Sequence, residues 1–203
     1  MGMAAVVLAG GGAKRMGGAT KPVRRVGGVA LLARVLAASA AATPRVVVGP
    51  LELVPLLPRG VSLTQENPPG GGPVAATAAG VGLISGAIDD ETQIAVLAAD
   101  LPFLTPSTVD AIAEAAAGEG YDAAVLVDDT GRPQWLCGVW RARALTARLS
   151  ELGDPAGHGM RDLVTGLRVA RVQSAIAAPP PWFDCDTEDD LRRAEELIRG
   201  DAG

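Results

Sequence analysis

A run of three glycines near the start of the chain is followed by cations, a combination that suits a triphosphate. Glycine lets the backbone approach a phosphate closely, and consecutive N–H groups can point at its oxygens. Arginine and lysine would then neutralise the remaining charge. The alternative is a glycine turn beside two solvated cations. The residues concerned are Leu8, Ala9, Gly10, Gly11, Gly12, Arg15 and Lys21.

Two common phosphate-binding motifs do not fit this segment. A Walker loop needs Gly-Lys-Ser/Thr after its second glycine, and here Gly17 is followed by Gly18. The dinucleotide fingerprint needs a glycine at the sixth position counted from Gly10, where this chain has Arg15. The chain has only two lysines, Lys14 and Lys21, and both lie in this segment. If the segment binds a nucleotide, it does so through neither of these two motifs.

A carboxylate suited to a metal ion follows an apolar segment in the middle of the chain. Asp100 comes directly after residues 94–99 and precedes Leu101 and Pro102. Mg²⁺ prefers hard oxygen ligands and is often held by one or two carboxylates together with phosphate oxygens. The alternative is an aspartate that only caps a helix or closes a turn. We expect Asp100 to bind the metal and to contact the nucleotide.

Further carboxylates could complete such a site. Asp184 is the preferred second metal ligand, and Asp186 is the other candidate. Asp186 is equally explained as a charge partner at the amino end of the last helix, which Thr187 would cap. Glu66 precedes a Pro/Gly-rich loop. A carboxylate there could accept two N–H bonds from guanine, which cytosine does not offer. A solvated loop acid is the alternative for Glu66.

The amino-terminal segment resembles the signature of the molybdenum cofactor guanylyltransferase family, which are MobA-like nucleotidyltransferases. The resemblance lies in Leu8-Ala9-Gly10-Gly11, Arg15-Met16-Gly17 and Lys21, and it continues around Asp100. Related cytidylyltransferases tend to have alanine where Gly10 stands, so Gly10 favours guanine. The chain departs from the family at Thr20, where an acidic residue is common, and at Trp135, where a proline is usual.

The resemblance implies an enzyme that transfers GMP from GTP to molybdopterin, releasing pyrophosphate and forming molybdopterin guanine dinucleotide. It implies Mg²⁺ bound by Asp100, catalytic roles for Arg15, Lys21 and Asp100, and nucleotide contact by Glu66. It is also compatible with transient contact with molybdoenzymes or with proteins that deliver the cofactor. The alternatives are cytidylyl or other nucleotidyl transfer to a different small phosphorylated acceptor, and a non-catalytic nucleotide-binding protein.

Apolar strands and helical segments alternate from end to end, and this pattern predicts the elements that must position these residues. It predicts an α/β fold: a Rossmann-like, mostly parallel sheet with helices on both faces. The turn at 128–131 and the apolar segment 134–140 add a small antiparallel part. No linker interrupts the chain, so residues 1–203 are expected to form a single nucleotidyltransferase domain. Strands are expected at 3–9, 45–48, 61–63, 93–98, 123–127, 134–140 and 168–172, and helices at 30–42, 73–85, after 105, at 142–152, near 158 and at 187–199.

Composition excludes several other classes of protein. The net charge of −5 gives no sign of a nucleic-acid partner. Apolar stretches are interrupted well before the ~18 residues that a membrane span needs, so we expect a cytoplasmic protein without a membrane partner. Cys137 and Cys185 have no ligand-like spacing and read as buried thiols. His158 is the only histidine, which disfavours a histidine-rich zinc site.

Overall fold

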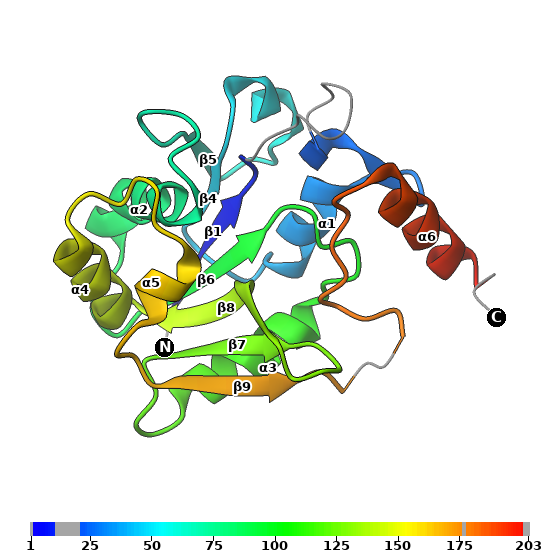
Figure 1. Cartoon of the computed structure of the whole chain (residues 1–203). Helices are drawn as coiled ribbons and strands as arrows, with labels where there is room; N and C mark the ends of the chain where they lie inside the picture. Colours follow the sequence, from blue (N-terminus) through cyan, green and yellow to red (C-terminus); the bar gives the residue numbers. More distant parts are fainter. Residues whose placement is uncertain (1, 11–20, 176–177, 201–203) are drawn as a thin grey trace.

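A seven-stranded sheet runs through the middle of the molecule and carries helices on both faces (Figure 1). The structure is a computed structural model, and it describes residues 2–10, 21–175 and 178–200. The strands follow one another across the sheet in the order β5-β4-β1-β6-β8-β7-β9. Their bounds are β1 Met3–Leu8, β4 Arg45–Val48, β5 Val61–Thr64, β6 Gln93–Ala98, β7 Ala123–Val127, β8 Pro133–Arg141 and β9 Val169–Gln173.

Most neighbouring strands of this sheet are parallel. β1 pairs in parallel with β4 and β6, β4 with β5, and β7 with β9. The predicted α/β class is therefore confirmed. The antiparallel strand that we expected as a small addition lies inside the sheet, because β8 pairs antiparallel with both β6 and β7. A separate two-stranded antiparallel sheet, β2 (Arg25–Val26) and β3 (Val29–Ala30), was not predicted.

A closed turn sends β8 back beside β7. The Asp128 carboxylate accepts the backbone N–H groups of Thr130 and Arg132, each at 2.9 Å, and the side-chain amide of Gln134 at 3.1 Å. The register then jumps, since Leu126 lies opposite Gln134 while its neighbour Val125 lies opposite Gly138. Trp135 falls within this bulge. It is half-buried and packs against the core.

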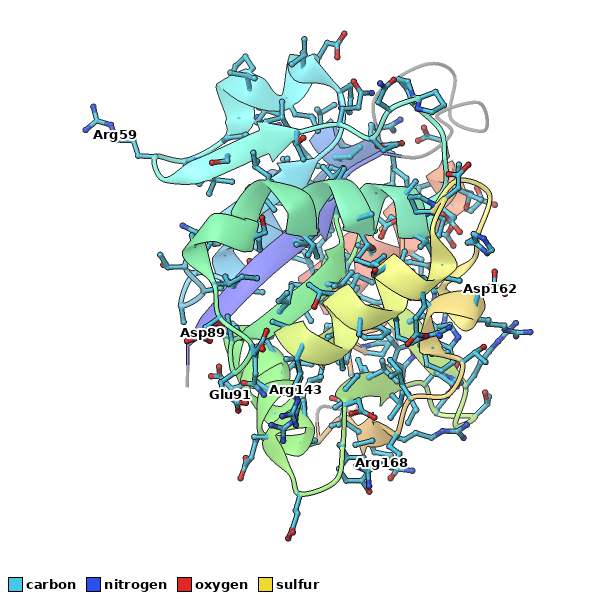
Figure 2. The ribbon with its side chains drawn as sticks, turned by 90° about the vertical axis from the view of Figure 1, so that its left-hand side faces the viewer. Arg59, Asp89, Glu91, Arg143, Asp162 and Arg168 are labelled. Carbon is cyan, nitrogen blue, oxygen red and sulfur yellow. The ribbon has the colours of Figure 1, made fainter. Side chains whose placement is uncertain are left out.

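The helices divide between the two faces of the sheet. One core lies under α1 and α3, and the other lies under α2, α4 and α5. Figure 2 shows the second face, with α2 and α4 in front of the strands and an exposed Glu91–Arg143 ion pair at the edge where β6 begins. The α-helices are α1 Leu31–Ala38, α2 Pro73–Ile84, α3 Pro106–Ala117, α4 Ala142–Leu152, α5 Met160–Val164 and α6 Glu188–Arg199; the 3-10 helices are η2 Lys21–Val23, η3 Leu51–Leu56 and η4 Ser85–Ala87.

Helix α1 is shorter than the predicted 30–42. It ends at Ala38, and the Ser39 hydroxyl donates back to the Val35 carbonyl at 3.0 Å. Such a bond offers the backbone an alternative to continued helix. Residues 40 and 42 then make short turn bonds, from Ala40 N–H to Ala37 and from Ala42 N–H to Ser39. The end of α1 could not be predicted from the alanine-rich sequence, because alanine favours the helix and does not terminate it.

Helix α2 packs unusually close to the sheet at Gly80. A Cβ atom at this position would lie 2.4 Å from Val6 Cγ1 and 3.0 Å from Val48 Cγ2. Glycine is therefore required here by the approach of helix to strand, not by its own backbone angles. Gly80 therefore lets α2 pack directly on β1 and β4. β1 leads into the amino-terminal glycine segment, and β4 ends beside it.

Helix α6 lies on a third, small core beside the segment that follows the amino-terminal loop (Figure 1). This core contains Val26, Leu31, Phe103, Cys185 and Leu191. As predicted, Thr187 caps the helix: its side chain accepts the Asp190 N–H at 3.1 Å, and the Asp190 carboxylate accepts the Thr187 N–H at 2.7 Å. No helix in the described part of the chain is long and apolar enough to cross a membrane.

Candidate active site

The carboxyl ends of β1, β4 and β6 meet at one edge of the sheet. Leu8, the last residue of β1, pairs with Val48 of β4 and with Ala98 of β6. Beyond the strands, the Ala9 N–H donates to the Val48 carbonyl at 2.8 Å and the Ala99 N–H donates to the Leu8 carbonyl at 3.0 Å. Ligands of open α/β folds bind beyond this edge. The segments that follow the three strands therefore share one place in space.

Lys21 and Asp100 lie in contact at this edge. The Lys21 Nζ is 2.5 Å from the Asp100 Oδ2, and both side chains are about four-fifths buried, at 21% and 20% exposed. Lys21 also forms an ion pair with Asp186. Burial lowers the pKa of Lys21, but Asp100 and Asp186 raise it by more, so its pKa lies above the ordinary value. The ammonium is therefore charged at neutral pH.

Asp184 lies in the same electrostatic environment. The Cys185 N–H donates to the Asp100 carbonyl at 3.2 Å, which fixes this segment beside the end of β6. Partial loss of hydration raises the pKa of Asp184, repulsion from Asp186 and Asp100 raises it further, and Lys21 opposes the shift. Three carboxylates thus gather around one lysine.

Glu66 brings a fourth carboxylate to the end of β1. Its side chain is buried, and its Oε1 accepts the Gly70 N–H at 3.0 Å. Its Oε2 is buried and has no hydrogen-bond partner among the residues described. A Cβ at Gly10 would lie 3.8 and 3.9 Å from the two carboxylate oxygens. A buried carboxylate oxygen without a donor is costly, so this atom is poised to accept a hydrogen bond from a ligand.

A cavity of about 320 Å³ opens beside Glu66. It is lined by residues 65–68 of the loop after β5, by three alanines of α2 and by residues 154–156. The Gly157 N–H donates to the Gly71 carbonyl at 2.8 Å and so joins the two loops. At Gly72, a φ of 95° permits the sharp entry into α2 that only glycine takes readily.

The structure brings most of the predicted site residues to one edge. Leu8 and Ala9 are buried at the end of β1, Gly10 lies beside Glu66, and Lys21 contacts Asp100. Gly11, Gly12 and Arg15 lie outside the described residues. In the part of the chain that is described, no group of three or more His, Cys, Asp or Glu side chains is arranged to hold a metal ion. The roles assigned to these residues stay predictions.

Two contacts of this site had no counterpart in our sequence predictions. We expected Asp186 at the amino end of the last helix, and its side chain pairs with Lys21. We had no expectation for Arg24, which forms an ion pair with Glu188. Partners more than 160 residues apart leave no local pattern to find. The one available signal was the placement of both lysines, Lys14 and Lys21, in one segment of a chain that otherwise uses arginine.

Comparison with known proteins gives a consistent picture. The model of the family described as MobA-like NTP transferase domain matches residues 5–172. A molybdenum cofactor guanylyltransferase from Bradyrhizobium sp. (strain ORS 278) is 29% identical over 194 residues, which cover 95% of this chain and 91% of that protein. A protein of the same name from Rhodopseudomonas palustris (strain BisB5) is 31% identical over 217 aligned positions, covering 98% and 95%.

A solved structure shares the fold. Molybdopterin-guanine dinucleotide biosynthesis protein A from Archaeoglobus fulgidus superposes with a TM-score of 0.74. The match covers 97% of this chain and 99% of that one, at 21% sequence identity. Similarity at this identity establishes the arrangement of strands and helices.

Proposed function

Because the chain belongs to the MobA-like NTP transferase family and is a nucleotidyltransferase, we propose that it transfers GMP from GTP to molybdopterin. The products would be molybdopterin guanine dinucleotide and pyrophosphate. The names of the relatives from Bradyrhizobium and Rhodopseudomonas support this choice of substrates. Transient contact with molybdoenzymes or with proteins that deliver the cofactor belongs to the same proposal.

The contact between Lys21 and Asp100 is the observation that carries the proposal. In nucleotidyl transfer, an oxygen of the acceptor phosphate attacks the α-phosphorus of the triphosphate in line with the leaving group. The bond to the bridging oxygen breaks, and pyrophosphate leaves with the electron pair. The acceptor is already anionic, so positioning and charge neutralisation are what the protein must supply. Lys21, charged and partly dehydrated, would neutralise the phosphates and the departing pyrophosphate.

We propose Mg²⁺ as the divalent metal ion, bound near Lys21 by two carboxylates together with phosphate oxygens of the nucleotide. Asp184 has a raised pKa because it has lost hydration and because Asp186 and Asp100 repel its charge. A divalent cation would relieve this repulsion, and carboxylate oxygens are the hard ligands that Mg²⁺ prefers. Asp100 and Asp184 would hold the ion. When bound, it would supply further positive charge to the phosphate oxygens.

Glu66 supports guanine as the base. Its Oε2, which has no partner among the described residues, and its Oε1 lie beside Gly10, where the nucleotide would enter. Guanine presents N1–H and N2–H donors side by side, which a carboxylate can accept together. The backbone of Gly10 to Gly12 and the Arg15 guanidinium would bind the phosphates; for Gly11, Gly12 and Arg15 this part of the proposal rests on sequence.

A pyrophosphate-release assay tests the proposed function. The protein is incubated with Mg²⁺, molybdopterin and each of GTP, CTP, ATP and UTP in turn. We expect release with GTP and little with the others, and none when molybdopterin is omitted. Release with CTP in preference to GTP would identify a cytidylyltransferase. Binding of GTP without release under any condition would instead identify a nucleotide-binding protein.

A further inference from the structure

Two ion pairs join the start of α6 to the segment that follows the amino-terminal loop. Lys21 pairs with Asp186, and Arg24 pairs with Glu188 through both guanidinium nitrogens, with Nη2 to Oε2 at 2.5 Å. The matched family model ends at residue 172, so both acidic partners lie beyond it. The carboxyl-terminal segment thus contributes a charged group to the candidate site.

The backbone around Asp186 is held on both sides. On one side, Cys185 is fully buried and its N–H donates to the Asp100 carbonyl at 3.2 Å. On the other side, Thr187 and Asp190 form a capping box, and the Asp190 carboxylate also accepts the Asp186 N–H at 3.1 Å. The Asp186 side chain itself is 62% exposed, so the core does not require it. Its position is therefore rigid, while its contribution to folding is small.

A lysine ammonium can bind two carboxylates and a phosphate at the same time, so Asp186 can act beside Asp100. The ammonium has three N–H donors, of which one can serve Asp100, one Asp186 and one a phosphate oxygen. In the proposed function, Asp100 also serves a metal ion, which would weaken its hold on Lys21. Asp186 is then the carboxylate that keeps Lys21 in the site. Thr20, the residue before Lys21 in the sequence, carries no charge that could do this.

We propose that Asp186 is a positioning residue that orients Lys21 toward the triphosphate from the carboxyl-terminal segment. The proposal rests on the proposed function, because it assigns Lys21 to the phosphates. It requires that the effect of Asp186 on turnover pass through Lys21. A role of Asp186 confined to the stability of α6 would not depend on the residue at position 21.

A double-mutant cycle tests this dependence. Asp186→Ala should lower kcat/KM for GTP by up to about fivefold, the upper end of what an exposed ion pair contributes. In a Lys21→Met background, Asp186→Ala should cause no further loss, because the partner is already absent. Asp189→Ala is the matched control, since Asp189 lies three residues further on, in the first turn of α6, and pairs with Arg192. An equal loss in both backgrounds, or no loss in either, overturns the proposal.

A second measurement, made with Mg²⁺ present so that Asp100 is engaged by the metal, needs no substrate and separates the two proposals. Lys14 and Lys21 are the only lysines, so ¹³C-labelled lysine gives two Cε signals, which a Lys14→Arg variant assigns. Asp186→Ala should lower the order parameter of the Lys21 Cε, and Asp186→Glu should restore it; an unchanged value overturns the proposal. If the unaltered protein releases no pyrophosphate, the proposed function fails, and the lysine spectra still decide the role of Asp186.

Discussion

Replacement of Glu66 by glutamine should remove the preference for guanine while the fold persists. The Oε1 atom of Glu66 already accepts the Gly70 N–H, and the buried Oε2 atom has no partner in the described structure. Glutamine would present an NH₂ group, which cannot accept the guanine N–H groups. A hydrogen bond to a charged group is worth about 1.5–3 kcal/mol, or roughly 10- to 150-fold in binding. We expect kcat/KM for GTP to fall by this factor.

Inosine triphosphate sharpens the assay because it lacks the 2-amino group of guanine. The unaltered protein should prefer GTP to inosine triphosphate in pyrophosphate release, and the Glu66→Gln variant should treat them nearly alike. The control is Asp154→Asn in the lining of the same cavity, where Asp154 accepts the Ala156 N–H at 2.9 Å. That variant should keep the preference. If Glu66→Gln also keeps it, Glu66 does not bind the base.

Three further variants test the phosphate site, the metal site and the packing of α2. Lys21→Ala should lower turnover by roughly 100-fold or more, as loss of one transition-state donor does, and should lower turnover more than it lowers fold stability; equal turnover would remove Lys21 from the mechanism. Asp100→Asn should shift the Mg²⁺ dependence of turnover to higher concentration, and an unchanged titration would exclude Asp100 as a ligand. Gly80→Ala should destabilise the fold, because overpacking against Val6 costs about 1–3 kcal/mol and outweighs the ~1 kcal/mol that alanine gains in a helix. Gly82→Ala, where a Cβ would meet nothing within 4 Å, should raise the melting temperature instead; a loss in both variants would contradict this packing argument.

Sequence alone determined the chain order of the seven strands of the main sheet and of the α-helices, and it determined the family. Apolar runs such as residues 93–98 and 123–127 are buried strands, as expected for a sheet covered on both faces. Caps such as Thr187 were readable because a cap acts on backbone groups only three residues away. The spacing from Leu8 to Lys21 carried the resemblance that the family match confirms. These features depend on residues that are close in the chain, so they can be predicted from the sequence.

Tertiary structure alone decided which distant groups share the site. No local pattern indicated that β8 would insert between β6 and β7, or that Asp186 would meet Lys21 across 165 positions. The same holds for Glu66, whose burial beside Gly10 follows from the parallel pairing of β1, β4 and β5. Such contacts depend on the simultaneous packing of many elements. A carboxylate in sequence shows its chemistry, and only the folded chain shows which cation, hydrogen-bond donor or ligand it will meet.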